Sequence, residues 1–75
     1  MVKLPTITGQ ELINALTKIN FVKIRQKGNH VRMKHEDGRV VTIPVHSGKA
    51  VGKGLLNKIL RDADLTKEEL IDLLS

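Results

Sequence analysis

His30 is the residue in this sequence best placed for acid–base chemistry, because cationic side chains precede it at alternate positions. It follows the run Arg25-Gln26-Lys27-Gly28-Asn29. Alternate residues of an extended strand share a face, so Arg25 and Lys27 would point the same way. An imidazole can give and take protons near neutral pH, and neighbouring cations can stabilise negative charge that develops on a phosphate. The pattern indicates RNA cleavage without a metal ion, although a solvent-exposed histidine with no catalytic role would show the same sequence.

The other two histidines are expected to differ in role. His46 lies in a loop before a helical segment, where it could be a second acid–base group, a phosphate contact or an ordinary loop residue. His35 is an odd number of residues from His30, so it should point to the helix-covered side at the rim of the sheet, as a structural or solvent-facing residue. Three scattered imidazoles, with no cysteine and no carboxylate pair on their face, do not make a metal site. We therefore expect no metal and no other cofactor.

Positive charge is concentrated in the middle of the chain. The net charge is +5, but residues 18–58 hold ten Lys or Arg against two acidic residues (net +8), and residues 59–75 hold two against five (net −3). Such a block is typical of a nucleic-acid-binding surface, although a well-solvated basic protein would also show it. Phe21 is the only aromatic residue, which argues against a base-stacking platform for single-stranded RNA. The candidate RNA contacts are Lys23, Arg25, Lys27, Arg32, Lys34, Lys49 and Lys53.

The last two of these lysines lie in a glycine-rich connection, Gly48-Lys49 and Gly52-Lys53-Gly54, just before a helical pattern. Free backbone amides at the start of a helix favour phosphate. The spacing is not that of a P-loop. Basic residues here fit a protein that meets phosphates across a double-stranded RNA groove, and they also fit a mobile solvated linker.

Two hairpins are expected between residues 22 and 44. Gly28-Asn29 separates two strand-like runs, and glycine supplies the positive φ that a type II′ turn requires at its first central position. This two-residue loop places Lys27 opposite His30, Arg25 opposite Arg32, and Lys23 opposite Lys34. Like charges that face each other destabilise a ladder by roughly 0.2–1 kcal/mol each. The arrangement therefore favours a polyanionic partner.

The second hairpin should turn through the three residues Glu36-Asp37-Gly38, because a two-residue loop would put apolar residues on the wrong face. This register places Met33 opposite Val41, Val31 opposite Ile43 and His30 opposite Pro44. Proline cannot donate to a ladder, so Pro44 marks the end or the edge of a strand. If the chain continues straight past Pro44, His46 lies close to the Gly28-Asn29 turn.

Helices are expected before and after the two hairpins in the sequence. Capping boxes at Thr8–Glu11 and Thr66–Glu69 predict helices over residues 9–19 and after residue 66, and a third helix carries Leu55, Leu56, Ile59, Leu60 and Ala63. The fold class is α+β, an α-β-β-β-α sandwich with a short C-terminal helix, in one domain of residues 1–75. The face under the helices should carry Val22, Ile24, Val31, Met33, Val41 and Ile43. The open face should carry Lys23, Arg25, Lys27, His30, Arg32 and Lys34.

No apolar run is long enough to span a membrane, and the first residues lack the pattern of a signal peptide. We therefore expect a cytoplasmic protein with no membrane partner. Without cysteine there is also no disulfide framework.

Several motifs together resemble the HicA toxin family. The matching stretches are Phe21–His30, Asp37-Gly38-Arg39, Thr42–His46, Gly48-Lys49, and Leu56 with Ile59, Leu60, Leu65 and Thr66. The resemblance implies a fold similar to double-stranded-RNA-binding domains. It further implies an mRNA-cleaving toxin of a bacterial or archaeal toxin–antitoxin system, and a HicB-type antitoxin that covers the active histidine.

The same resemblance assigns residues. The family's catalytic histidine lies in a Gly-Ser-His motif, which falls on Gly28, Asn29 and His30. Asn29 replaces the serine; its amide can still donate a hydrogen bond, but with a different reach. His46 falls in the family's Pro-Val-His stretch, to which no role is transferred.

We thus expect a metal-independent endoribonuclease with His30 as general acid or base. Arg25, Lys27, Asn29 and His46 are possible catalytic support. The alternative is a non-catalytic double-stranded-RNA-binding module on the same fold. A domain whose cationic face docks an acidic protein is compatible with both.

Overall fold

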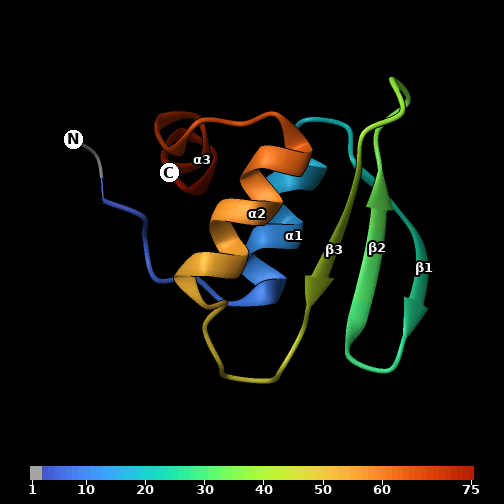
Figure 1. The fold of residues 1–75 in the computed structure, drawn as a ribbon, viewed down its shortest axis with the longest axis horizontal. Helices are drawn as coiled ribbons and strands as arrows, with labels where there is room; N and C mark the ends of the chain where they lie inside the picture. The colour runs from blue at the N-terminus through green and yellow to red at the C-terminus, as the bar shows by residue number, and fades with distance from the viewer. Residues whose placement is uncertain (1–2) are drawn as a thin grey trace.

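A computed structural model describes residues 3–75, which form an α+β fold with one three-stranded antiparallel sheet. The elements in chain order are α1 (Gly9–Thr17), β1 (Val22–Lys27), β2 (His30–Lys34), β3 (Val40–Pro44), α2 (Lys53–Ala63) and α3 (Lys67–Leu74). The helices lie on one side of the sheet and leave its other face open (Figure 1). The expected order of elements is confirmed.

Both capping boxes form as predicted. The Thr8 hydroxyl accepts from the Glu11 backbone N–H, and the Glu11 carboxylate accepts from the Thr8 N–H. Thr66 and Glu69 make the same reciprocal pair at the start of α3. Each pair satisfies backbone donors that the first helical turn leaves free, so both helices begin at the residue after the threonine.

The register between β2 and β3 is as predicted. Met33 lies opposite Val41, Val31 opposite Ile43, and His30 opposite Pro44. The three-residue loop between the strands closes with the His35 N–H donating to the Arg39 carbonyl, and Gly38 takes a φ of +100°. Because glycine alone adopts this backbone conformation without strain, Gly38 allows the chain to reverse here.

The first hairpin differs from the prediction in its outer half. Gly28 has a φ of +56°, and Lys27 faces His30 while Arg25 faces Arg32, as expected for the two-residue turn. Between Lys23 and Arg25 the register then shifts. Ile24 is the extra residue of a β-bulge, and an extra residue reverses the alternation beyond it.

The expected pairing of Lys23 with Lys34 is therefore wrong. Val22 lies opposite Lys34, and Lys23 lies opposite Met33. Lys23 thus does not belong to the open cationic face, and Val22 does. Repulsion between two lysines is avoided in this half of the ladder.

The core lies between the helices and strands β2 and β3. Phe21, Leu12, Leu16, Met33, Ile43 and Leu56 are among its fully buried side chains. The helices pack mainly on β3, and every residue of β1 is exposed. The prediction that Val22 and Ile24 lie under the helices is wrong, because β1 is an edge strand outside this layer and its bulge turns Val22 outward. Leu55, on the first turn of α2, is also exposed, at 40%.

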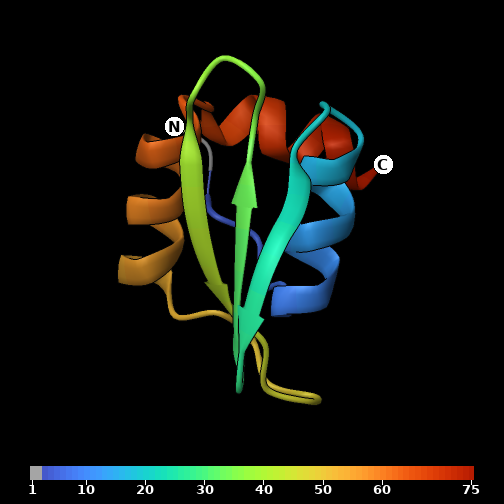
Figure 2. The ribbon, with the colours of Figure 1, turned by 90° about the vertical axis from the view of Figure 1, so that its right-hand side faces the viewer.

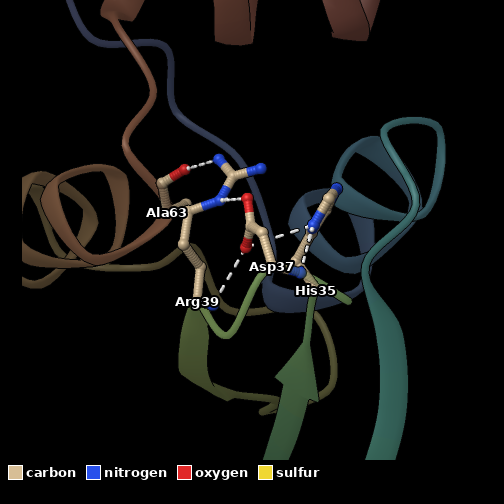
Figure 3. A network of polar contacts seen from close by, with 4 residues as sticks. All are labelled: His35, Asp37, Arg39 and Ala63. Atoms are coloured by element: carbon tan, nitrogen blue, oxygen red, sulfur yellow. Dashed lines mark hydrogen bonds and ion pairs between the residues drawn. The ribbon is translucent and has the colours of Figure 1, made fainter.

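A polar network holds the β2–β3 loop against the end of α2 (Figure 3). The Arg39 guanidinium donates to the Ala63 carbonyl and, through Nε at 2.8 Å, to the Asp37 carboxylate. It also lies over the Phe21 ring, 5.2 Å from the centroid. His35 meets the same ring edge-on at 5.3 Å and has a side chain only 14% exposed. Of the two roles expected for His35, structural or solvent-facing, these contacts support the structural one.

The start of α1 fixes the position of the chain after β3. Gly9 is buried, and a Cβ at this position would overlap the Pro44 carbonyl oxygen and lie 3.2 Å from Val45 Cα. The adjacent segments are also joined by a bridge between Thr8 and Ala50 and by the Val51 N–H donating to the Ile7 carbonyl at 2.8 Å. Only glycine therefore permits this close approach of helix and strand end.

Candidate active site

The open face of the sheet carries a shallow hollow around His30. Arg25, Lys27, His30, Arg32 and Thr42 line it, with a volume of about 270 Å³. Figure 2 looks onto this face, with the strands in front and the helices behind. We call it the His30 hollow. The structure thus brings together the histidine and three of the cations that the sequence predicted.

Backbone pairing on two sides positions His30. It is the first residue of β2, directly after the Gly28-Asn29 turn, and it pairs with Lys27 of β1 and Pro44 of β3. The strand ladder on both sides fixes the backbone, while the side chain stays exposed to solvent. An imidazole held in this way can reach a large ligand lying on the sheet.

Like charges face each other within the hollow. Arg25 lies directly opposite Arg32, and no carboxylate is among the residues that line the hollow in the described part of the chain. Cross-strand repulsion of this kind costs roughly 0.2–1 kcal/mol per pair. An anion bound between the guanidinium groups would relieve that repulsion and accept charge-assisted hydrogen bonds. The hollow is therefore suited to a phosphate.

Thr42 is a residue of the hollow that the sequence analysis missed. It pairs with Arg32 across the β2–β3 ladder, so its hydroxyl lies on the same face as His30. The correctly predicted register already implied this position. Thr42 was overlooked because a neutral side chain gives no charge or titration signal.

Asn29 and His46 meet at the tip of the first hairpin, outside the His30 hollow. The Val45 N–H donates to the Asn29 carbonyl at 2.6 Å, and Asn29 Nδ2 lies 3.4 Å from His46 Nδ1. An amide NH₂ can only donate, so a hydrogen bond here requires the imidazole to accept at Nδ1. The predicted proximity of His46 to the turn is confirmed. The two side chains line a separate hollow together with Thr8, Gln10 and Gly48.

The other predicted cations lie away from the hollow. Lys34 is on the open face at the far end of β2, whereas Lys23 bonds Gln26 on the edge strand at 3.3 Å. Lys49 and Lys53 are exposed, in the β3–α2 loop and at the first residue of α2. That loop and the hairpin tip lie at the same end of the molecule (Figure 1). These lysines can contact a ligand longer than one phosphate, but they do not line the His30 hollow.

Residues 3–75 lack two further kinds of feature. No group of three or more His, Asp or Glu side chains converges there in a way that could hold a metal ion. No helix in the same region is long and apolar enough to cross a membrane.

Comparison with known proteins gives one family. Residues 9–65 match the model of the HicA toxin of bacterial toxin–antitoxin systems. No curated protein sequence matches the chain. The matched region runs from the first residue of α1 past the end of α2 and contains the whole sheet with the His30 hollow. The chain therefore belongs to the HicA toxin family.

Proposed function

We propose that this protein is the toxin of a toxin–antitoxin pair and an endoribonuclease that cleaves mRNA in the cytoplasm without a metal ion, using His30 as general acid or base. The observation that carries the proposal is the placement of His30 beside Arg25, Lys27 and Arg32 in one solvent-open hollow. Membership of a family whose toxins are mRNA interferases supports the same reaction class.

The chemistry requires few groups. A base removes the proton from a ribose 2′-hydroxyl, and the oxygen attacks the adjacent phosphorus. The bond to the 5′-oxygen of the next nucleotide breaks, this oxygen takes up a proton, and a 2′,3′-cyclic phosphate remains. A neutral imidazole can take the first proton and an imidazolium can supply the second. His30 can perform either transfer because its ring is exposed on the face that receives the RNA.

The cations and the Thr42 hydroxyl of the hollow would stabilise the negative charge that develops on the phosphate during the reaction. Negative charge grows on the non-bridging phosphate oxygens as the 2′-oxygen attacks, and fixed donors aimed at these oxygens lower the barrier. Arg25, Lys27 and Arg32 are such donors, and the Thr42 hydroxyl is a neutral one. Lys34, Lys49 and Lys53 would hold more distant phosphates of the same RNA. Asn29 and His46 would support the site through the hairpin tip.

A HicB-type antitoxin would inhibit the toxin by covering the His30 face. Family membership implies an antitoxin partner. The same cations that bind RNA would then meet carboxylates of the antitoxin. RNA and antitoxin should therefore compete for the toxin.

The proposal is tested with purified toxin, a defined mRNA and EDTA. Wild type should cleave, and His30→Ala should lose about 10²–10⁴-fold in rate, the usual contribution of a general acid–base group. His35→Gln is the matched control, because His35 packs against Phe21 on the other side of the sheet. If His30→Ala retains the rate of wild type, the assignment is wrong. If wild type and His30→Ala both fail to cleave RNA but both bind it with a steep salt dependence, the chain is an RNA-binding module.

A further inference from the structure

Strand β1 exposes two large aliphatic side chains that the core does not use. Val22 is 59% exposed and Ile24 is 50% exposed. Among the described residues only Leu55, on α2, joins them as a large exposed hydrophobic side chain. We call Val22 and Ile24 the β1 apolar patch. A bulge at Ile24 and the position of β1 at the sheet edge are responsible for the exposure.

The patch borders a hollow with a volume of about 650 Å³. Its lining residues are Thr17, Asn20, Phe21, Val22, Ile24, Lys34, His35 and Glu36. Apolar side chains beside a concave surface are typical of a site where a protein side chain docks. The hollow lies at the end of β1 opposite the hairpin tip, so it is separate from the His30 hollow.

RNA does not account for the patch. Its backbone is recognised by cations and hydrogen-bond donors, and its bases stack on aromatic or guanidinium planes. Two β-branched aliphatic side chains provide none of these contacts. In a protein–protein interface, by contrast, burying them would add apolar area at the centre of the contact.

The positive charges around the patch favour an acidic protein as its partner. Lys23 and Arg25 flank Ile24 in β1, and Lys34 lies directly opposite Val22, whereas Glu36 is the one carboxylate lining the hollow. A second copy of this chain, with its net charge of +5, would bring like charges together. A partner with carboxylates around apolar side chains would instead pair with these cations and bury the aliphatic side chains.

The patch also lies next to the His30 hollow along β1. Ile24 is adjacent in sequence to Arg25, which lines that hollow, and Val22 shares its face with Arg32 and His30 through the ladder register. A partner anchored at the patch therefore needs to extend only along β1 to cover His30. RNA binding needs the cations of this face but not the two aliphatic side chains.

We propose that Val22 and Ile24 anchor the antitoxin, whose apolar side chains dock at the β1 apolar patch while its carboxylates pair with Arg25 and Lys34. The inference rests on the proposed function only in taking the partner to be an antitoxin that inhibits this toxin. Its consequence is a separation of roles. The patch holds the antitoxin, and the His30 hollow binds both antitoxin and RNA.

The test uses Val22→Thr/Ile24→Thr, which keeps β-branched residues in the strand and removes apolar surface. Leu55→Thr is the control, since it removes another exposed aliphatic side chain, one that lies outside the patch. Affinity for the co-purified antitoxin, the product of the adjacent reading frame, is measured by calorimetry. Affinity for a 2′-O-methyl RNA, which cannot be cleaved, is measured by fluorescence anisotropy. The double variant should bind antitoxin at least 30-fold more weakly and RNA within twofold of wild type, while the control changes neither.

Unchanged antitoxin affinity in the double variant would overturn the proposal. An equal loss of RNA affinity would make the patch an RNA contact, and loss of a toxin dimer with unchanged antitoxin affinity would make it a self-association surface; both results also overturn it. Should the double variant fail to fold, the methyl NMR signals of Val22 and Ile24 in wild type decide. They must shift when antitoxin saturates the protein, and unmoved signals contradict the docking. Neither readout depends on cleavage, so an inactive toxin would refute the nuclease proposal without touching this one.

Discussion

Arg25 and Arg32 lie directly opposite each other on adjacent strands, and both line the hollow that contains His30. Two guanidinium groups in this position repel each other until an anion lies between them. The sheet thus keeps a small amount of unfavourable electrostatic energy at the place where a phosphate would bind. Removing one of the pair should therefore have opposite effects on folding and on binding.

Arg32→Gln is expected to leave the free energy of unfolding unchanged or to raise it by up to about 1 kcal/mol, because one cross-strand repulsion is lost. RNA affinity should fall, and the slope of log K against log salt should become shallower by roughly 0.7, the value for one phosphate contact on a single strand. Urea unfolding and fluorescence anisotropy at several salt concentrations measure the two effects. Lys58→Gln, which removes a cation paired with Asp62 on α2, is the control and should leave the RNA affinity nearly unchanged.

Gly9→Ala should destabilise the protein by about 1–3 kcal/mol, the usual range for overpacking a tight contact. Its Cβ would overlap the Pro44 carbonyl, and Pro44 pairs with His30, so cleavage should fall as well. Gly54→Ala is the matched control, because a Cβ there meets no atom within 4 Å. In the helix this control should be neutral or stabilising by up to about 1 kcal/mol. Equal melting temperatures for the two variants would argue against the close packing of α1 on the end of β3.

Arg39→Lys should destabilise the protein by about 1–3 kcal/mol in urea unfolding. Lysine keeps the charge, but it lacks the planar fork that reaches the Ala63 carbonyl and Asp37 while lying over the Phe21 ring. Arg61→Lys, on the exposed side of α2, should change stability by less than about 0.5 kcal/mol. A loss confined to Arg39→Met, with full stability in Arg39→Lys, would show that charge alone holds the loop.

Asp37 should make part of the protein's free energy of unfolding depend on pH. The backbone N–H of Arg39 has the largest effect and lowers the pKa of Asp37 below its ordinary value of 3.8. Desolvation, the second-largest effect, opposes it, and the Arg39 side chain and His35 each lower the pKa by less. A carboxylate whose pKa is lower in the folded state than in the unfolded state stabilises the protein at pH values above its unfolded-state pKa. This stabilisation is lost as the pH falls through the folded-state pKa. Stability should therefore decrease below about pH 4, and Asp37→Asn should flatten that decrease. An identical acid limb in thermal melts of both proteins would contradict the role of Asp37.

Asn29→Ser should retain cleavage within about tenfold of wild type. The Asn29 side chain lies against His46 and does not line the His30 hollow. The hairpin tip keeps its backbone bond from Val45 to the Asn29 carbonyl in either variant. Single-turnover rates on a defined RNA check this expectation. A loss as large as that of His30→Ala would place the amide in the reaction itself.

How far the sequence predicted this structure depended on local signals. Gly28 and Gly38 mark their turns through positive φ, and loop length then sets the register, so the pairs His30–Pro44 and Arg25–Arg32 were predictable. The bulge at Ile24 has no such signal, because Val-Lys-Ile-Arg alternates as a regular strand would.

The lack of a local sequence signal also explains which residues were missed in the candidate site. His30, Arg25, Lys27 and Arg32 were found by charge and parity, whereas neutral Thr42 needed the observed hollow. Val22 and Ile24 were placed under the helices because they alternate with Lys23 and Arg25, and only the packing of the helices on β3 shows that they are exposed. Local pattern thus predicted the ladder except beyond the bulge at Ile24, and tertiary packing decided which side chains it left exposed.

The central claim is that the imidazole of His30 transfers a proton during RNA cleavage. Chemical rescue tests it most directly, with single-turnover cleavage of a defined RNA by His30→Ala in EDTA, with and without added imidazole. The variant should be slower by about 10²–10⁴-fold, and free imidazole should restore part of the rate as its concentration rises. Cleavage by the variant at the wild-type rate, unaffected by imidazole, would contradict the claim.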